Sequence, residues 1–251
     1  YQGGRQMLVL ENIVWTLPTG GDILKGVNLE IPDGKLTVIT GPNGGGKTSL
    51  AKIISGVETP TSGHIILNGE DITEFDVTQR ARRGIGYAFQ QPVRFKGLTV
   101  RSLLELAAGE SLSEPALCGL LGKVGLCARD YIDREADASL SGGEIKRVEI
   151  ATLLARRNLS LAVFDEPEAG IDLWSFSGLI DVFQQLKKDS GPSMLIISHQ
   201  ERILQIADNI VVIADGKVRM SGAGGEVLPM LLEGEMSSQC PIHEMKGRDC
   251  L

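Results

Sequence analysis

An eight-residue stretch, Gly41 to Thr48, has the residue types and spacing of a loop that binds phosphate. Its sequence GPNGGGKT fits the pattern G-x-x-x-x-G-K-[ST], with a strand-like apolar run before it and a helix-forming run after it. Glycines let backbone N–H groups approach phosphate oxygens, and the helix N-terminus adds partial positive charge. We therefore predict a nucleoside triphosphate site, in which Lys47 binds the β- and γ-phosphates and Thr48 binds Mg²⁺. The other predicted contacts are Gly41, Asn43, Gly44, Gly45, Gly46 and Ser49.

Polar residues that could complete this chemistry follow other apolar runs. Asp165 and Glu166 come directly after residues 161–164, which read as a strand buried on both faces. Ligands of an open α/β sheet bind at that end of a strand. Asp165 is therefore predicted to hold Mg²⁺ and Glu166 to polarise the attacking water. Gln90 and His199 each follow a further run of this kind, although alone either could be structural.

The composition disfavours several classes of function. The chain has 251 residues, 42% of them hydrophobic, and a net charge of −7. A chain with this negative net charge lacks the general excess of basic residues that is typical of nucleic-acid-binding proteins. No apolar run approaches the roughly 18–20 residues of a membrane span, and no signal peptide is recognisable, so we expect no direct membrane insertion. We expect a cytoplasmic protein with reduced thiols, because a phosphate-loop enzyme belongs in the cytosol and the four cysteines form no repeated C-x-x-C pair.

The order of the runs predicts an α/β fold around a parallel core sheet. Residues 8–31 alternate apolar and polar positions around a Pro-Thr-Gly-Gly turn, which indicates an N-terminal antiparallel β subdomain. Leucines and alanines at helical spacing between about 92 and 139 predict an inserted helical subdomain. The expected divisions are a domain over 7–235, a flexible C-terminal tail over 236–251 and the remnant of an expression tag over 1–6.

The pentapeptide Leu140-Ser141-Gly142-Gly143-Glu144 resembles the signature motif of ABC-type ATPases. Ser141 and the glycines precede a helix-forming run, so they can cap a helix N-terminus that accepts an anion. The family's whole ordered set of motifs is then present, over about residues 8–232. The segments are 41–48 (Walker A), Gln90 (Q-loop), 140–144 (signature), 161–166 (Walker B), 169–172 (D-loop) and His199 (switch histidine).

The resemblance implies a P-loop NTPase of the ABC type that hydrolyses ATP with Mg²⁺. In this family two subunits pack head to tail, and the signature of one closes over the γ-phosphate bound by the other. ATP is then expected to join two copies and hydrolysis to release them. The implied catalytic residues are Glu166, His199 and Gln90. The implied Mg²⁺ ligands are Thr48, Gln90 and Asp165, and the signature residues on the nucleotide are Ser141, Gly142, Gly143 and Glu144.

Three segments resemble the SufC-type ATPases of iron–sulfur cluster assembly more than transporter subunits. Residues 142–150 have Glu144 where transporters usually have Gln, followed by Lys-Arg-x-Glu, and segments 198–204 and 169–172 are also SufC-like. Gln91 departs from that pattern, which suggests a divergent member from a minimal two-component system. The likeness implies a soluble SufB-like scaffold as partner. The alternative is the nucleotide-binding motor subunit of a membrane ABC transporter.

Two features allow more than one interpretation. Many family members stack a tyrosine on adenine, but Pro18 stands near that position here, and the nearest aromatic, Trp15, could equally be a core residue. Cys240, His243 and Cys250 approach the spacing of metal ligands without a complete set of four. They are either a metal site or part of the flexible tail.

Overall fold

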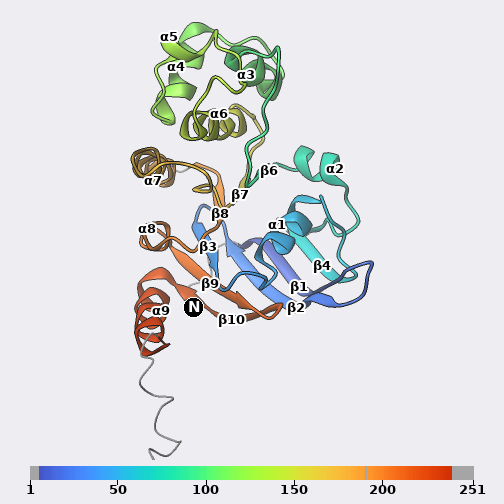
Figure 1. The fold of residues 1–251 in the computed structure, drawn as a ribbon. Helices are drawn as coiled ribbons and strands as arrows, with labels where there is room; N and C mark the ends of the chain where they lie inside the picture. Colours follow the sequence, from blue (N-terminus) through green and yellow to red (C-terminus); the bar gives the residue numbers. More distant parts are fainter. Residues whose placement is uncertain (1–5, 190, 239–251) are drawn as a thin grey trace, which may run out of the picture.

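Two β-sheets form the framework of the protein (Figure 1). The computed structural model describes residues 6–189 and 191–238. The strands are β1 (Gln6–Thr16), β2 (Asp22–Pro32), β3 (Leu36–Thr40), β4 (Ser62–Leu67), β5 (Glu70–Asp71), β6 (Ile85–Ala88), β7 (Leu161–Asp165), β8 (Ser193–Ile197), β9 (Asn209–Ala214) and β10 (Lys217–Ala223). The larger sheet has the order β10-β9-β3-β8-β7-β6, and the smaller, antiparallel sheet has the order β2-β1-β4-β5. Strands β9, β3, β8, β7 and β6 are parallel, and β10 is antiparallel at the edge.

The parallel strands are buried on both faces, which explains their continuous apolar sequences. Successive side chains alternate between two cores, so Val38 and Ile196 join one cluster while Ile39 and Ile197 join the other. The first core lies under the helices, and the second lies between the two sheets. The expected parallel core sheet and N-terminal antiparallel subdomain are both confirmed.

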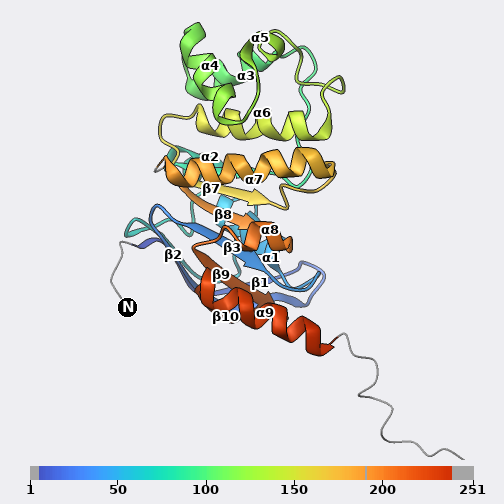
Figure 2. The ribbon, with the colours of Figure 1, turned by 90° about the vertical axis from the view of Figure 1, so that its left-hand side faces the viewer.

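Helices cover the larger sheet and extend beyond it (Figures 1 and 2). They are α1 (Lys47–Ser55), α2 (Val77–Arg82), α3 (Val100–Ala108), α4 (Glu114–Lys123), α5 (Ala128–Tyr131), α6 (Gly142–Leu154), α7 (Leu173–Lys188), α8 (Glu201–Leu204) and α9 (Gly224–Ser238). Helices α7, α8 and α9 lie on one side of the sheet, and α1 and the smaller sheet lie on the other.

The inserted helical subdomain comprises α3, α4 and α5, within the expected residues 92–139. Helix α6 follows it and contacts α3 and α4 as well as α7, so it joins the subdomain to the core. Figure 2 shows α6 and α7 as adjacent layers. Helix α9 includes the first three residues of the segment 236–251 that was expected to be a flexible tail. The candidate metal ligands Cys240, His243 and Cys250 lie outside the described residues.

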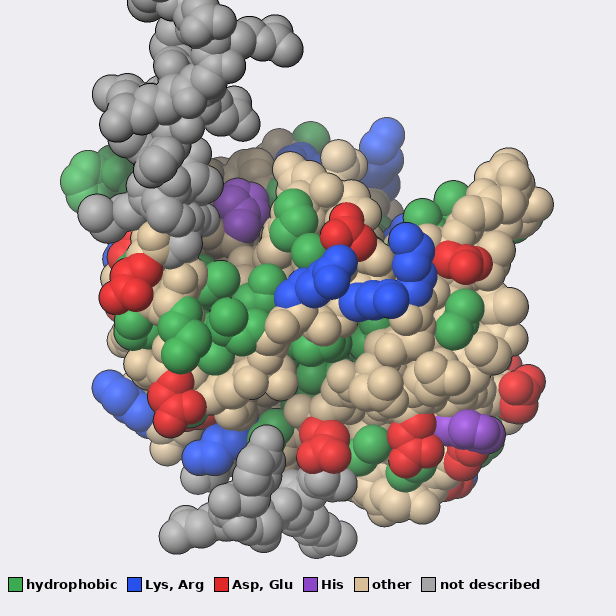
Figure 3. Space-filling view, turned by 90° about the horizontal axis from the view of Figure 1, so that it is seen from below, with side chains coloured by type: hydrophobic (Ala, Val, Ile, Leu, Met, Phe, Trp, Pro, Cys, Tyr) green, Lys and Arg blue, Asp and Glu red, His purple; other side chains and the backbone are tan. Residues whose placement is uncertain are grey.

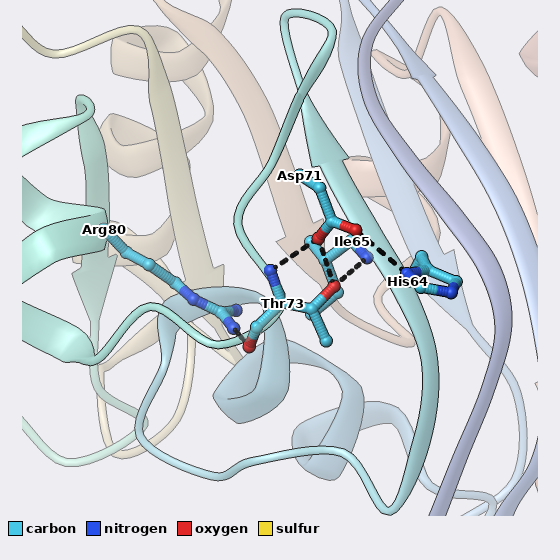
Figure 4. A network of polar contacts seen from close by, with 5 residues as sticks. All are labelled: His64, Ile65, Asp71, Thr73 and Arg80. Carbon is cyan, nitrogen blue, oxygen red and sulfur yellow. Dashed lines mark hydrogen bonds and ion pairs between the residues drawn. The ribbon is translucent and has the colours of Figure 1, made fainter.

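A buried arginine secures the helix that follows the phosphate loop. Arg80, on α2, is 1% exposed and donates hydrogen bonds to the carbonyls of Ile53 and Ile54 at the C-terminal end of α1. It also donates to the carbonyl of Thr73, whose own amide and hydroxyl groups donate to Asp71 (Figure 4). A guanidinium with several donors suits this cluster of carbonyls. Burial lowers the pKa of Arg80 to about 10, below the usual range of a guanidinium.

On the underside of the molecule, acidic side chains surround a small group of Lys and Arg beside an apolar patch (Figure 3). Charges of both signs are thus interspersed on this face. Among the helices of residues 6–189 and 191–238, none has the length and apolar character needed to cross a membrane.

Candidate nucleotide-binding site

Four parallel strands carry the predicted site residues to one edge of the larger sheet. Neighbouring strands β3, β8, β7 and β6 run in the same direction, so their carboxyl ends meet. The phosphate loop follows β3 and His199 follows β8. Asp165 ends β7, and Gln90 lies two residues beyond β6. The sheet topology therefore gathers segments that are far apart in the sequence.

The phosphate loop is held from outside by the turn between β9 and β10. Gly41 has a φ of 131°, and a Cβ atom on it would lie 2.1 Å from the carbonyl oxygen of Ile213. Only glycine therefore fits this position. The amide of Gly216 donates to the carbonyl of Gly45 at 3.2 Å. These contacts fix the loop where it passes between strand and helix.

The loop lines a cavity of about 220 Å³ that combines polar loop groups with one carboxylate. The lining residues are Ile23, Asn43, Gly44, Gly46, Lys47, Thr48, Ser49 and Glu166. The Lys47 ammonium donates to the carbonyls of Gly41 and Pro42, at 2.8 and 2.9 Å. Burial lowers the pKa of Lys47, and the carboxylates of Glu166 and Asp165 oppose that shift. A cation, backbone amides and a helix N-terminus converge here, as binding of a polyphosphate requires.

Asp165, at the end of β7, forms hydrogen bonds to α1 and to the neighbouring strand β6. Its Oδ1 accepts a hydrogen bond from the Thr48 hydroxyl at 3.1 Å, and its Oδ2 accepts one from the Tyr87 hydroxyl at 3.0 Å. Burial raises the pKa of Asp165, while these two hydrogen bonds lower it. Tyr87 has its pKa raised mainly by burial and then by Asp165, so the hydroxyl stays a donor. The carboxylate of Asp165 is thus bonded to the hydroxyl of Thr48, which lines the cavity.

Glu166 has a strained backbone and a side chain held by Gln90. Its φ is 44°, the left-handed region that is unfavourable for a residue with a side chain. Its amide donates to the Ile197 carbonyl at 2.9 Å, which links the end of β7 to β8. The Gln90 Nε2 donates to Glu166 Oε2 at 2.6 Å. Strain of this kind concentrates at functional sites, where the surrounding structure fixes it.

His199 lies at the same edge but is exposed and does not bond to Glu166 among the described contacts. Its ring is 3.5 Å from the side-chain nitrogen of Gln200. The preceding Ser198 is buried, and its hydroxyl donates to Glu168 and accepts the amide of Gln200 at 3.0 Å. Glu168 and Ser198 thereby position the backbone on either side of the histidine.

The signature segment forms the capped N-terminus of α6. The Ser141 hydroxyl accepts the Glu144 amide at 3.2 Å, and Glu144 accepts the Ser141 amide at 2.7 Å, which makes a capping box. The Tyr131 hydroxyl donates to Glu144 at 2.6 Å, and this bond lowers the pKa of Glu144. A Cβ on Gly143 would lie 2.4 Å from that of Ser175, so glycine permits close contact between the first turns of α6 and α7.

The signature and the phosphate loop open onto different pockets. Gly142 lines a second cavity of about 270 Å³ with Gln90, Gln91, Pro92, Arg94, Ala169 and Gly170. Among the described residues that line the loop cavity, none belongs to the signature. The structure thus brings together Lys47, Thr48, Asp165, Glu166 and Gln90, while the signature lies outside the loop cavity and meets this set only at Gln90, in the second cavity.

Comparison with known proteins agrees with this set of motifs. A family model described as "ABC transporter" matches residues 24–169, more than half of the chain. The "Uncharacterized ABC transporter ATP-binding protein MJ0035" of Methanocaldococcus jannaschii is 41% identical over 214 residues, which cover 82% of this chain and 85% of that protein. The chain belongs to the ABC ATPase family.

Further relatives of this ABC ATPase include an importer subunit and a dimeric cassette. The "Sulfate/thiosulfate import ATP-binding protein CysA" of Synechocystis is 34% identical over 207 residues. The aligned region covers 81% of this chain and 57% of that protein. A solved structure of the cassette MJ0796, described as a dimeric post-hydrolysis state bound to ADP and Pi, has a TM-score of 0.76 and 26% identity, over 86% of this chain and 98% of that one. The fold is that of an ABC cassette, and the enzyme is an ATPase whose cofactors are ATP and Mg²⁺.

Several residues of the ABC ATPase site were not predicted from the sequence. Lys146, 1% exposed on α6, donates to the Phe89 carbonyl and pairs with Glu149 at 3.0 Å. Glu149 accepts the Phe89 amide at 3.2 Å, so both backbone groups of the residue before Gln90 are bound to α6. Burial raises the pKa of Glu149, and Lys146 opposes that shift. The pair of charges three residues apart on α6 was visible in the sequence, but its backbone target was not.

The apolar wall of the loop cavity is Ile23, from β2. Trp15, the aromatic residue considered for adenine, packs against the core between the two sheets. It is partly buried and does not line the described cavity. In this structure Trp15 therefore packs as a core residue, in agreement with the second of its two interpretations.

Proposed function

We propose that this ABC ATPase acts as a head-to-tail dimer that closes around ATP and opens after hydrolysis. The supporting observation is that the signature helix begins at a surface separate from the loop cavity. One chain then supplies the loop half of one site and the signature half of another. The similar cassette MJ0796 is described as a dimer, which supports dimer formation by this chain.

In this proposal each polar side chain of the loop cavity has a distinct role. Lys47 exchanges its two loop carbonyls for phosphate oxygens, which satisfy the same ammonium donors. Glu166 orients the attacking water, and Gln90 fixes the position of its carboxylate. His199, at the adjacent strand end, contacts the terminal phosphate once the dimer closes. The capped N-terminus of α6, with Ser141 to Glu144, supplies amide groups to the phosphate bound by the second copy.

The donor set fits Mg²⁺. A hydroxyl and a carboxylate oxygen, from Thr48 and Asp165, lie 3.1 Å apart, and hard cations prefer oxygen ligands. These two residues would hold the ion, which supplies positive charge to the β- and γ-phosphates. Gln90 bonds Glu166 through Nε2, so its metal contact would come from Oε1.

Substitution of Glu166 tests the catalytic part of the proposal. Glu166→Gln should lower ATP turnover by at least about 100-fold, because water loses its general base, while ATP binding persists. With MgATP the variant should accumulate as a dimer in sedimentation velocity. Glu226→Gln is the control, since it alters an exposed carboxylate on α9 that does not line the loop cavity. Unchanged turnover in Glu166→Gln, or a variant that stays monomeric with MgATP, would refute the proposal.

Closure of the dimer has to act on a partner protein, and an apolar groove provides a binding site for that partner. The groove is lined by Tyr87, Phe89, Val93, Phe95, Leu103 and Leu106, among others, and has a volume of about 270 Å³. Phe89, Val93, Phe95 and Leu106 are exposed, which is unusual for a cluster of large apolar side chains. Phe89 adjoins Gln90, so an occupant would contact the segment that holds Glu166.

For the identity of this partner we propose a soluble SufB-like scaffold for iron–sulfur cluster assembly. The support is the likeness of residues 142–150, 169–172 and 198–204 to SufC-type ATPases. The capping box that includes Glu144 is compatible with that likeness. The second candidate is a membrane component of a transporter, which the names of relatives such as CysA favour.

Purification from the native host, after cross-linking in cells, distinguishes the two partners. The tagged chain should recover a soluble protein that binds iron and sulfide, identified by mass spectrometry, in the membrane-free fraction. A partner with membrane-spanning segments would refute the scaffold proposal and support the transporter. The control is Leu106→Glu, which places a charge in the groove and should abolish recovery of a genuine groove-bound partner.

A further inference from the structure

Tyr87, on β6, makes contacts of different kinds at the two ends of its side chain. Its ring lines the apolar groove beside Phe89, and the two rings meet edge to face with their centroids 4.8 Å apart. Its hydroxyl donates a hydrogen bond to Asp165 Oδ2 at 3.0 Å. A single side chain therefore joins the groove to the carboxylate that bonds Thr48 of the phosphate loop.

The register between β6 and β7 explains how Tyr87 reaches this carboxylate. Tyr87 pairs with Val163 in the parallel ladder. Side chains of a strand alternate between its two faces, so Asp165 lies on the same face as Val163, two residues farther along β7. The length of the tyrosine side chain spans this offset and brings its hydroxyl to the carboxylate.

The Asp165 carboxylate is held at both of its oxygen atoms. Asp165 is 2% exposed, and its Oδ1 and Oδ2 accept the hydroxyls of Thr48 and Tyr87 respectively. Two donors on opposite oxygens fix the rotation of a carboxylate. Loss of the Tyr87 hydroxyl would remove the donor of a buried oxygen, which favours a turn of the carboxylate toward another partner.

We propose that Tyr87 is a positioning residue for Mg²⁺, which acts through Asp165, and that its ring links the groove to the metal site. The inference rests on the proposed Mg²⁺ site at Thr48 and Asp165 and adds the residue that orients the carboxylate. Tyr87 is not among the described residues that line the loop cavity, so its effect on the ion is indirect. Removal of a hydrogen-bond partner from a ligating carboxylate typically weakens metal affinity 10–100-fold.

Tyr87→Phe tests the positioning role, because it removes the hydroxyl and keeps the ring. The full-length chain carries Glu166→Gln to slow hydrolysis and is kept in excess over ATP. Mn²⁺, whose free and bound forms differ in EPR signal, is titrated in place of Mg²⁺. The Mn²⁺ dissociation constant should rise at least about tenfold in Tyr87→Phe, while ATP binding in EDTA, measured by calorimetry, stays unchanged.

Two further variants calibrate this measurement. Asp165→Asn removes the proposed metal ligand and should weaken Mn²⁺ binding at least as much as Tyr87→Phe does. Ser55→Ala is the matched control, since it also deletes a buried hydroxyl, one that donates to the Ala51 carbonyl within α1. Its Mn²⁺ dissociation constant should equal that of the Glu166→Gln background.

A double-mutant cycle tests the link to the groove. Phe89→Leu removes the ring that packs on Tyr87 and should raise the Mn²⁺ dissociation constant by about threefold. In the Tyr87→Phe background the same substitution should have no further effect, because the hydroxyl that carries the link is gone. An equal effect in both backgrounds would assign Phe89 to a route through its neighbour Gln90 and overturn the groove link, as would no effect in either.

The outcomes separate the role of Tyr87 from the metal site itself. If Asp165→Asn weakens Mn²⁺ binding and Tyr87→Phe does not, the positioning role is overturned and the proposed Mg²⁺ site stands. If neither variant changes the Mn²⁺ dissociation constant, both are overturned. If Ser55→Ala weakens Mn²⁺ binding as much as Tyr87→Phe, the effect is a general loosening of the fold, which also overturns the positioning role.

Discussion

Glu168 is a carboxylate enclosed where the end of β7 meets the residues before His199. Its Oε1 accepts the Ser198 hydroxyl, while its buried Oε2 has no hydrogen-bond partner among the described residues. Burial raises the pKa of Glu168, and the Ser198 bond opposes the shift only in part. A carboxyl whose pKa is higher in the folded than in the unfolded protein makes folding less favourable as pH rises through that interval.

Glu168→Gln should therefore change how stability depends on pH. The neutral amide can still accept the Ser198 hydroxyl, so the variant should match the wild-type free energy of unfolding near pH 4 and exceed it near pH 7.5. Urea unfolding across that range measures the difference. A constant difference at every pH would contradict the assigned cause, and Glu226→Gln provides a control for a carboxylate on the surface of α9.

At the scale of single residues, local motifs were predictable and cross-strand contacts were not. The loop Gly41 to Thr48 is contiguous, so its chemistry is readable from spacing alone. The hydrogen bond from Tyr87 to Asp165 depends on the register between β6 and β7, which the sequence does not reveal. The left-handed backbone of Glu166 is likewise set by its bond to the Ile197 carbonyl.

At the scale of elements, α6 connects the signature to the Q-loop through a buried ion pair. Lys146 and Glu149 hold the carbonyl and the amide of Phe89, one residue before Gln90. Lys146→Met should cost about 3–5 kcal/mol of the free energy of unfolding, because it leaves a buried carboxylate unpaired. Lys146→Met with Glu149→Gln should recover part of that loss, though the Phe89 carbonyl remains without its donor.

Urea unfolding of the two single variants and the double variant gives the coupling energy. Arg83→Met is the matched control, since it breaks an ion pair with Glu70 at the surface and should cost much less. If Lys146→Met and Arg83→Met lower the free energy of unfolding equally, the buried pair does not hold the Q-loop in place.

Most elements were predictable because their apolar periods were long. The parallel strands and the leucine-rich helices of the insertion have strong patterns, and each lies within a few residues of its expected position. Helix α2 was not predicted, because its stability comes from its capping box and from the burial of Arg80 instead of an apolar face. Helix α9 was not predicted either, and Pro229 within it weakens any helical signal.

At the scale of the whole molecule, the proposed function assigns different partners to three surfaces. The loop cavity takes the nucleotide, the signature at the first turn of α6 faces a second copy in the proposed dimer, and the apolar groove is left for another protein. Gln90 bonds Glu166, which lines the loop cavity, and it directly follows Phe89, which lines the groove and is held by Lys146 of α6. Closure at one surface can therefore move the others. The sequence predicted this division only through the family resemblance, because the three surfaces are assembled from distant segments.

Leu106→Glu tests whether the groove is the place where closure acts on the partner. Leu106 is 74% exposed on α3, so a charge there should not disturb the core, and thermal unfolding should stay close to wild type. Affinity for the purified partner, measured by calorimetry, should fall by at least about tenfold, because an apolar contact surface would have to desolvate a carboxylate. Val77→Glu, half exposed at the start of α2, is the matched control and should bind normally. Equal affinity in Leu106→Glu and Val77→Glu would place the partner elsewhere and separate the groove from the ATP-driven motion.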